Sequence, residues 1–282
     1  MVWNQIKTVL LLSALTGIVL LLGGYVGGTA GLTIAFVLAL GMNAISYFWS
    51  DKIVLMMYGA KEAAKKDYPQ LHKIVEEVSC AAGIPKPKVY IIQSATPNAF
   101  ATGRNPSNAV VAATSSILQL LSNEELKGVI GHEIGHVKNR DILICTIAAT
   151  LATIISYVGQ MLQFSAIFGG GRDDRNSGSF LGMIAIAILA PIMALLIQLA
   201  ISRSREYIAD ETGAAITGKP QHLASALRKL EAGVKQHPMR MGSPATSSLF
   251  IVNPFSASAL VSLLSTHPPT AERVKRLEAM KV

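Results

Sequence analysis

The amino-acid sequence predicts a mainly α-helical protein with a small β-sheet, in which the chain crosses a membrane several times. Hydrophobic residues make up 51% of the 282 positions and charged residues only 15%, whereas about 25% of residues are charged in ordinary soluble domains. Long uncharged runs alternate with polar segments, and the polar segments contain helical patterns and a few short strand-like runs. The length allows one or two domains with a sizeable core.

The first uncharged run predicts a membrane hairpin. No charged residue lies between Lys7 and Asp51. Because one helix needs about 20 apolar residues to cross a bilayer, this run is long enough for two spans. The glycine-rich stretch Gly23–Gly31 is the expected turn between them. The run lacks a clear small-residue cleavage site and a second span follows at once, which favours an anchor over a cleaved signal peptide.

Two further uncharged runs predict a second hairpin, which brings the number of expected spans to four. They cover residues 142–171 and 176–202 and are separated by a polar loop. Pro191 lies inside the last run, where a membrane helix tolerates a proline as a kink. The four expected parts of the chain are a first hairpin (1–50), a first polar part (51–141), a second hairpin (142–202) and a second polar part (203–282).

The distribution of charge predicts the orientation of these spans. Lys and Arg outnumber Asp and Glu by 11 to 9 in residues 51–141 and by 11 to 6 in residues 203–282, whereas the loop between the third and fourth spans has two of each. Because Lys and Arg accumulate on cytoplasmic segments, both polar parts and both termini are expected in the cytoplasm. The same tendency accounts for the net charge of +8. With no basic run of five or more residues, nucleic acid is not an expected partner.

The first polar part is expected to begin with a helix followed by short strands. Residues 68–83 carry apolar residues at helical spacing and end at a glycine, which is a helix stop signal. Residues 87–94 and 108–114 have the composition of short strands. The turn-rich stretch between them includes another strand-like run, Asn98–Thr102.

Further helices are expected along the rest of the polar parts. Ser122 with Glu125 three residues later forms a capping box, which predicts a helix that begins at Ser122. The second polar part is mainly helical, with helical patterns over residues 221–233 and after Thr270. The helix that begins at Ser122 carries the motif on which the functional prediction depends.

That motif is HEIGH, residues 132–136. His132 and His136 are four residues apart, so both lie on one face of the helix and can bind one metal ion. Zn²⁺ lowers the pKa of the water bound to it to about 7 and polarises a peptide carbonyl. Glu133 points to the neighbouring side, where a carboxylate can take the proton of that water and pass it to the leaving amine. The motif therefore predicts a metal-dependent peptidase, with a structural metal site closed by four protein ligands as the alternative.

Glu206 is the expected third ligand. It lies directly after the last uncharged run, and Asp210 follows it at helical spacing on the same face. Two His and one Glu leave a fourth position of the metal open, as catalytic zinc requires. Asp210 is then placed to accept a hydrogen bond from the second nitrogen of a ligand histidine. The alternative interpretation of Glu206 is a surface salt bridge with Arg203 or Arg205.

These motifs together resemble the HtpX-type membrane metalloproteases, which are relatives of the zinc CAAX prenyl proteases. The resemblance covers nearly the whole chain and is carried by HEIGH followed by NRD, by SREYIAD and by STHPPTAERVKRL. It implies a gluzincin-like zinc protease domain in the cytoplasm, anchored in a bacterial-type inner membrane. It further implies one Zn²⁺ per chain bound by His132, His136 and Glu206, with Glu133 as general base. The implied role is quality control under stress, in which misfolded or damaged membrane proteins are cleaved.

The resemblance also suggests a substrate-binding strand. In related gluzincins the peptide substrate pairs with an edge strand above the catalytic helix, and the backbone of the strand supplies the affinity. The run NAFAT resembles that strand here, and its residues are Asn98, Ala99, Phe100, Ala101 and Thr102.

Two further side chains each have two interpretations. His267 either helps to stabilise the oxyanion or caps and packs beside Pro268, and the structural role is slightly favoured. Asn139 either forms a hydrogen bond near the end of the catalytic helix or is a turn residue.

Two other functions compete with that of a protease acting at the membrane surface. An intramembrane protease is disfavoured because Lys127, Lys138, Arg140 and Asp141 flank HEIGH, and charges are costly in the middle of a bilayer. A transporter or receptor with a structural metal would have no use for Glu133. Polypeptides, including membrane proteins, are the expected substrates. The sequence leaves the oligomeric state open.

Overall fold

The computed structural model describes residues 51–168, 177–239, 249–255 and 267–280, together with single positions among the first 50 residues. The chain divides into two compact units. The first unit takes its described residues from 47–143 and 202–280, and the second is formed by residues 144–201 with positions from the first 50. Most of the expected N-terminal hairpin with its Gly23–Gly31 turn lies outside the described residues, and so does the loop between the expected third and fourth spans.

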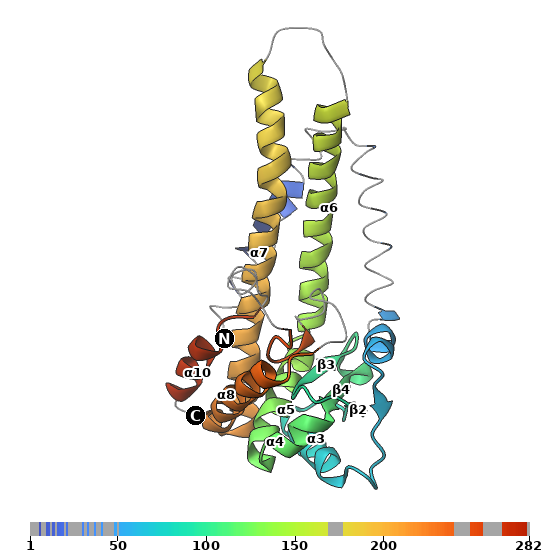
Figure 1. The fold of residues 1–282 in the computed structure, drawn as a ribbon, viewed down its shortest axis with the longest axis vertical. Helices are drawn as coiled ribbons and strands as arrows, with labels where there is room; N and C mark the ends of the chain where they lie inside the picture. Colours follow the sequence, from blue (N-terminus) through green and yellow to red (C-terminus); the bar gives the residue numbers. More distant parts are fainter. Residues whose placement is uncertain are drawn as a thin grey trace. The chain divides into compact units, whose positions relative to one another are not determined.

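The first unit contains a four-stranded mixed sheet (Figure 1). Its strands β1 (Lys61–Glu62), β2 (Lys88–Ile92), β3 (Ala99–Thr102) and β4 (Val110–Thr114) follow the order β1-β2-β4-β3. β2 and β4 run parallel, whereas β1 and β3 pair antiparallel with their neighbours. The three strands expected from the sequence are confirmed, and the two-residue β1 was not expected. β3 is an edge strand of the described sheet.

The described part of the first unit also contains helical residues 51–57, the 3-10 helix η1 (Pro106–Asn108), the ends of two longer helices that continue into the second unit, and five complete α-helices. They are α3 (Pro69–Ala82), α4 (Ser115–Leu120), α5 (Asn123–Lys138), α8 (Pro220–Gln236) and α10 (Thr270–Glu278). α3 ends at Gly83, whose φ of 69° lies in the left-handed region that glycine adopts without strain. All of these helices except the short α4 lie where the sequence predicts them.

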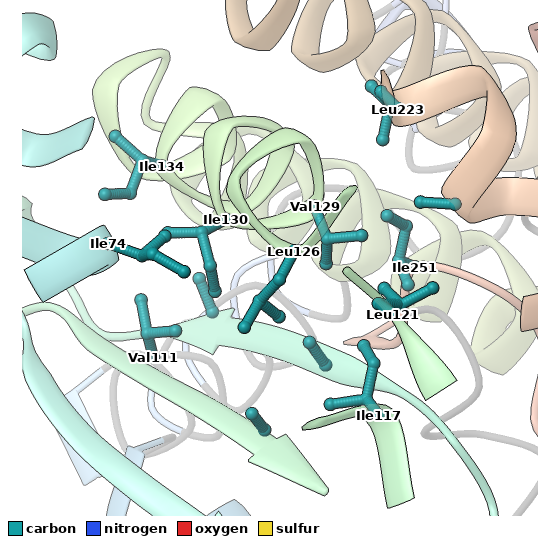
Figure 2. Close-up of a cluster of buried hydrophobic side chains, with 14 of the residues drawn as sticks. Ile74, Val111, Ile117, Leu121, Leu126, Val129, Ile130, Ile134, Leu223 and Ile251 are labelled. Carbon is teal, nitrogen blue, oxygen red and sulfur yellow. The ribbon is translucent and has the colours of Figure 1, made fainter. Parts of the chain in front are cut away.

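α5 is the central helix of the first unit. Eleven of its sixteen residues are buried, because it packs against the sheet and against other helices rather than presenting one face to water. Figure 2 shows Leu126, Val129, Ile130 and Ile134 of α5 in a single cluster with side chains from α3, β4, α4 and α8. Burying an aliphatic side chain of this size contributes about 1.5–3 kcal/mol. The helix that carries HEIGH is therefore held in place by the main hydrophobic core.

The start of α5 is fixed by the expected capping box. The Ser122 hydroxyl accepts a hydrogen bond from Glu125 N at 3.3 Å, and Glu125 Oε2 accepts one from Ser122 N at 2.9 Å. The Glu125 carboxylate also accepts hydrogen bonds from two residues of α8, Ser225 at 2.7 Å and Lys229 at 2.8 Å. One buried carboxylate thus ties the first turn of α5 to α8.

A seam of glycines lets α5 approach α7 (Ser177–Thr217) very closely. A Cβ atom on Gly135 would lie 3.0 Å from the carbonyl oxygen of Ala209, and one on Gly213 would lie 2.7 Å from the backbone nitrogen of His132. Both obstacles are backbone atoms, which cannot rotate away. The absence of side chains at these glycines therefore sets the distance between the histidines of α5 and the acidic residues of α7.

α5 and α6 (Asp141–Phe168) are separated by a sharp break. Arg140 has a φ of 55°, in the left-handed region that residues with side chains rarely adopt. α6 restarts at once with Asp141. The uncharged run after HEIGH is thus a new helix rather than a continuation of α5.

In the second unit, α6 and α7 pair along their apolar stretches (Figure 1). Gln163 Nε2 donates to the carbonyl of Ala187 at 3.1 Å. The ring of Pro191 fits against Gly159, where a Cβ atom would lie 2.6 Å from its Cγ. Among the described residues, the segments Asp141–Gln163 and Ile184–Thr217 are long and apolar enough to cross a membrane, judged by length and composition.

The link between α5 and α8 gives a pH-dependent prediction. Burial raises the pKa of Glu125, but hydrogen bonds from Lys229, Ser225 and Ser122 outweigh it and lower the pKa from 4.5 to about 2. Because the pKa is depressed in the folded state, the carboxylate contributes its full stability above about pH 4.5 and loses it as the pH falls toward 2. We expect Glu125→Gln to lower the stability at pH 7 by about 2–3 kcal/mol, with the difference from the parent shrinking between pH 5 and 3, measured by thermal unfolding of the full chain.

Glu124→Gln is the matched control, because Glu124 is the neighbouring residue and its side chain is 65% exposed. That variant should unfold within about 0.5 kcal/mol of the parent at every pH. A Glu125→Gln penalty that stays constant from pH 7 to pH 3 would contradict the assignment.

The glycine seam gives a second prediction. Gly213→Ala should force α7 away from α5 and lower the stability by about 1–3 kcal/mol, as overpacking of a filled contact does. Gly182→Ala, in the same helix, is the control, since nothing lies within 4 Å of its Cβ position, and it should leave the unfolding temperature unchanged or raise it slightly. Equal unfolding temperatures of the two variants would show that the contact between α5 and α7 accommodates a methyl group at position 213.

Candidate metal centre

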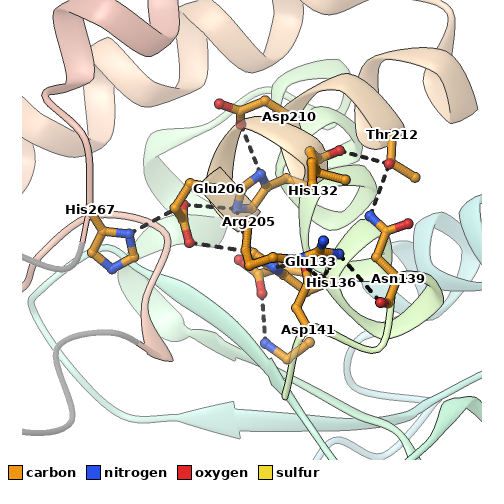
Figure 3. Close-up of polar contacts among 12 residues, drawn as sticks. His132, Glu133, His136, Asn139, Asp141, Arg205, Glu206, Asp210, Thr212 and His267 are labelled. Atoms are coloured by element: carbon orange, nitrogen blue, oxygen red, sulfur yellow. Dashed lines mark hydrogen bonds and ion pairs between the residues drawn. The ribbon is translucent and has the colours of Figure 1, made fainter. Parts of the chain in front are cut away.

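Three potential metal ligands converge between α5 and α7 (Figure 3). They are His132 and His136 of α5 and Glu206 of α7, and one ligand atom from each lies within 4.8 Å of the others. The two Nε2 atoms are 3.1 Å apart. Glu206 Oε1 lies 3.4 Å from Nε2 of His136, and Glu206 Oε2 lies 3.6 Å from Nε2 of His132. Two imidazole nitrogens and a carboxylate are a donor set that suits zinc.

Helix geometry accounts for this arrangement. The spacing of four residues stacks the two histidine rings along one face of α5, with centroids 4.6 Å apart and planes at 86°. The same spacing on α7 turns both Glu206 and Asp210 toward His132. The expectation that Glu206 and Asp210 share a helical face is confirmed.

Each of the two histidines has a buried carboxylate at its other ring nitrogen. Nδ1 of His132 lies 2.9 Å from Asp210 Oδ1, and Nδ1 of His136 lies 2.7 Å from Asp141 Oδ2 (Figure 3). A carboxylate can only accept, so Nδ1 must carry the proton and Nε2 keeps its lone pair for a metal ion. The two carboxylates thus select the tautomer in which both Nε2 atoms can act as ligands.

The two carboxylates are in turn paired with buried arginines. Arg273, from α10, donates to Asp210 through Nε at 2.9 Å and through Nη2 at 2.7 Å, and it also donates to the carbonyl of Ile251 at 2.8 Å. Arg205 donates through Nε to Asp141 Oδ1 at 2.6 Å. Both arginines are at most 4% exposed. Buried carboxylates need such partners, because an unpaired charge in the interior is strongly destabilising.

The protonation preferences of the two histidines differ. Burial, with a further contribution from the positive charge of Arg273, lowers the pKa of His132 to about 4. That keeps its imidazole neutral at neutral pH, which is the form that binds metal. Burial also acts to lower the pKa of His136, but hydrogen bonds with Asp141 and Glu206 outweigh it and hold that pKa well above its usual value.

Glu133 lies beside this cluster, 2% exposed. Its Oε2 accepts a hydrogen bond from the backbone N–H of Ala101 in β3 at 2.7 Å. Burial raises the pKa of Glu133 to about 8, and the negative charge of Glu206 acts in the same direction. A carboxyl group with a raised pKa beside a metal-ligand set is suited to proton transfer near neutral pH.

The Glu206 carboxylate supplies the test of whether these residues suit a cation. Its Oε2 is buried and has no hydrogen-bond partner among the described residues. It nevertheless lies within ion-pair distance of His267 Nδ1, at 3.2 Å, and of Arg273 Nη1, at 3.1 Å. A buried carboxylate oxygen beside a guanidinium, with no aligned hydrogen-bond donor, fits a ligand to a metal ion. The residues present therefore fit the expected zinc.

The alternative interpretation of Glu206 as part of a surface salt bridge is wrong. Glu206 is 4% exposed, and its neighbour Arg205 pairs with Asp141 instead.

The remaining predicted site residues lie around this cluster at different distances. His267 contacts Glu206, as described above. Asn139 is the C-cap of α5 and donates through Nδ2 to the hydroxyl of Thr212 in α7 at 3.0 Å. Its side chain therefore links α5 to α7 and does not support a ligand side chain through this bond.

The expected substrate strand is present as β3, but part of its outer edge is already paired. Thr114 N in β4 donates to the carbonyl of Asn98, so the backbone of Ala99 and Ala101 points away from β4. The Ala99 carbonyl accepts from Ile251 N at 3.2 Å, and Asn98 Nδ2 donates to the carbonyl of Val252 at 2.7 Å. Phe100 and Thr102 are buried within the sheet region.

Three residues that complete the site were not singled out from the sequence. In the sequence Asp141 stands out only as a charge flanking HEIGH, although a carboxylate just beyond the end of a histidine-bearing helix can reach back to it. The sequence suggests Arg205 only as a partner of Glu206. Arg273 carried a clear signal: it lies on the apolar face of α10 with Val274 and Leu277, all three being buried, and a lone arginine at such a position needs a buried acidic partner.

Comparisons with known proteins identify the family of this chain. A family model described as peptidase family M48 matches residues 65–281. A protease HtpX homologue of Syntrophobacter fumaroxidans is 54% identical over 280 residues, which cover 98% of this chain and 99% of that protein. A protease HtpX homologue of Pyrococcus abyssi is 53% identical over 272 residues, covering 96% of this chain and 94% of that protein.

A solved structure shows the same fold. The crystal structure of Ste24p from S. mikatae matches with a TM-score of 0.62 and 20% sequence identity, over 98% of this chain and 66% of that one. The family match and the nearly full-length identity above 50% establish that the chain belongs to peptidase family M48.

Proposed function

We propose that this M48 peptidase is a zinc-dependent endopeptidase, anchored in the membrane, that cleaves misfolded or damaged membrane proteins at the cytoplasmic face. The observation that carries the proposal is the position of Glu133, a buried carboxyl group next to a cluster of two histidines and a glutamate. A purely structural metal site has no use for that carboxyl group.

His132, His136 and Glu206 would hold the one zinc ion of the chain. Three protein ligands are the number found in catalytic zinc sites, where a fourth position admits water or substrate. When bound, zinc supplies Lewis acidity that polarises the peptide carbonyl and makes water easier to deprotonate. Asp210 and Asp141 hold the two histidine rings in the tautomer that binding requires.

Glu133 would act as the proton carrier of the reaction. Its raised pKa allows it to accept a proton from the attacking water and to give that proton to the leaving amine near neutral pH. Ala101 N–H fixes the orientation of the carboxyl group through Oε2. We assign His267 to the orientation of Glu206, which it contacts at 3.2 Å.

The β3 edge is the proposed site for the substrate main chain. An extended peptide can add to an exposed sheet edge through backbone hydrogen bonds, which makes binding tolerant of the side chains. We place this pairing at the Ala101 carbonyl, toward the Thr102 end of the Asn98–Thr102 run, because the Ala99 carbonyl accepts from Ile251 N and the Ala101 N–H donates to Glu133. Ala101 is also the residue that holds Glu133, so substrate bound there lies next to the proton carrier.

Membrane anchoring is supported by the surface of the second unit. Large apolar side chains of α6 and α7 are between 41% and 58% exposed, among them Tyr157, Met161, Leu189 and Leu196. Exposed apolar surface of this extent indicates contact with lipid rather than water. We propose four spans in a bacterial-type inner membrane, with the catalytic site and both termini in the cytoplasm, and with the bilayer and polypeptides as partners.

The proton-carrier assignment is tested by Glu133→Gln. We expect this variant to retain metal and to lose casein cleavage by at least about 10²–10⁴-fold, because the base is removed while all three ligands remain. Zinc content after dialysis and the rate of casein cleavage, each with and without chelator, provide the measurement.

Glu206→Ala is the contrasting variant. It removes a ligand and should lose zinc on dialysis as well as activity, whereas Glu133→Gln loses activity alone. Casein cleavage at the parental rate by zinc-loaded Glu133→Gln would contradict the catalytic proposal and favour a structural metal.

The orientation is tested by labelling single cysteines on intact cells with a membrane-impermeant thiol reagent. The background is the Cys80→Ser/Cys145→Ser protein. Arg172→Cys, in the loop between the third and fourth spans, should be labelled. Lys65→Cys and Lys275→Cys, whose native residues are exposed in the first unit, should be protected until the cells are opened. Labelling of position 65 or 275 on intact cells would overturn the cytoplasmic assignment.

A further inference from the structure

Of the two histidines, His136 depends more than His132 on a hydrogen bond to hold its ring in place. The side chain of His132 is 0% exposed, so packing on all sides helps to hold its ring, whereas the side chain of His136 is 18% exposed. A ring with an open side can turn about its side-chain torsions unless a polar contact stops it. At Nδ1 of His136, the nitrogen that faces away from Glu206, that contact is Asp141 Oδ2 at 2.7 Å.

Asp141 is itself held by Arg205. The Arg205 guanidinium contacts the other oxygen of the same carboxylate, Asp141 Oδ1, through Nε at 2.6 Å and through Nη2 as well. Asp141 is 3% and Arg205 4% exposed. With one oxygen on the histidine and the other on the guanidinium, the carboxylate plane has little freedom to rotate. Without Arg205, Asp141 would be left as a buried charge paired only with a histidine.

Arg205 also reaches the end of the helix that carries His136. Its Nη2 lies 3.4 Å from the carbonyl of Asn139, the C-cap of α5, next to the left-handed Arg140. The residue that follows Arg205 in α7 is Glu206. One guanidinium therefore connects the helix that carries Glu206 to the end of α5 and to the first residue of α6.

We propose that Arg205 is a positioning residue for the metal centre, which acts through Asp141 to aim Nε2 of His136 at the metal. The contact needs the planar guanidinium, because Nε and Nη2 both contact one carboxylate oxygen while Nη2 also reaches a backbone carbonyl. A lysine offers one charged nitrogen and cannot make these contacts together. This inference rests on the proposed zinc site and adds to it a residue that touches neither metal nor substrate.

The test measures zinc affinity directly, independently of proteolysis. The full-length protein in detergent is titrated with zinc in competition with a chromogenic chelator, and the visible absorption of the cobalt-substituted protein reports the ligand geometry. Arg205→Met should weaken zinc binding by about 10–100-fold, the range found when partners of metal ligands are removed. Arg205→Lys should fall between Arg205→Met and the parent, and both should alter the cobalt spectrum.

Arg228→Met is the matched control. Arg228 also pairs with a carboxylate, that of Glu278, but both side chains are about half exposed and lie outside the metal centre. Its zinc affinity should stay within twofold of that of the parent. This control shows whether loss of any arginine–carboxylate pair is by itself sufficient to weaken zinc binding.

A double variant separates positioning from general destabilisation. If Arg205 acts through Asp141, then Arg205→Met should weaken zinc binding no further in an Asp141→Asn background. If Arg205→Met fails to fold, the same comparison uses Arg205→Lys in its place. It then sets Arg205→Lys, Asp141→Asn and the double variant Arg205→Lys/Asp141→Asn side by side to decide whether Arg205 acts through Asp141.

Two failures are distinguishable. Parental zinc affinity and an unchanged cobalt spectrum in Arg205→Met, or in Arg205→Lys where only that variant folds, would overturn the role of Arg205 while leaving the zinc site intact. A parent protein that binds no zinc would overturn the proposed function itself, and this inference with it.

Discussion

The close approach of α5 and α7 is the constraint on which the site depends. Two helices that carry ordinary side chains at their contact lie about 8–10 Å apart, and the glycines at 135 and 213 remove the atoms that would prevent a tighter contact. The histidines and Glu206 are then near enough for a single ion to touch all three. Sequence changes anywhere along this seam would act on the metal centre through the separation of two backbones, without altering any ligand.

A second constraint comes from the number of charges that the approach buries. Glu133, Glu206, Asp210, Asp141, Arg205 and Arg273 are all at most 4% exposed. Removing them from water is costly, and ion pairs in the interior repay that cost only when geometry and hydrogen bonding are good. The pairing of Asp210 with Arg273 and of Asp141 with Arg205 meets this requirement on both sides of the histidines. Glu206 shares Arg273 with Asp210, and Glu133 is held by the backbone N–H of Ala101. These two acidic groups are the ones to which a role at the metal is assigned.

Local sequence patterns were sufficient to predict most of the described elements and to single out the three candidate ligands that the structure brings together. HEIGH and the pair Glu206–Asp210 are visible because helical spacing alone places their members on one face, and the capping box at Ser122 marks where the helix starts. The partners of these residues were harder to predict. Arg273 lies 63 residues beyond Asp210, and its contact exists only because α10 packs against the rest of the first unit. The pairing of Ile251 with Ala99 is likewise tertiary, and β1 is too short, at two residues, to leave a periodic signal.

The contribution of Arg273 has a consequence for the order in which the molecule is made. During translation the ribosome releases both histidines, Glu133 and Glu206 well before it releases α10. In that interval Asp210 lacks the guanidinium that pairs with it in the finished fold, and the buried charges cannot be balanced. The cluster of His132, His136 and Glu206 therefore reaches its final charge balance only after α10 has been made, later than the apolar helices between α5 and Arg205. A chain that has not yet been extended to α10 therefore holds its histidines and Glu206 without the guanidinium that balances Asp210 in the full structure.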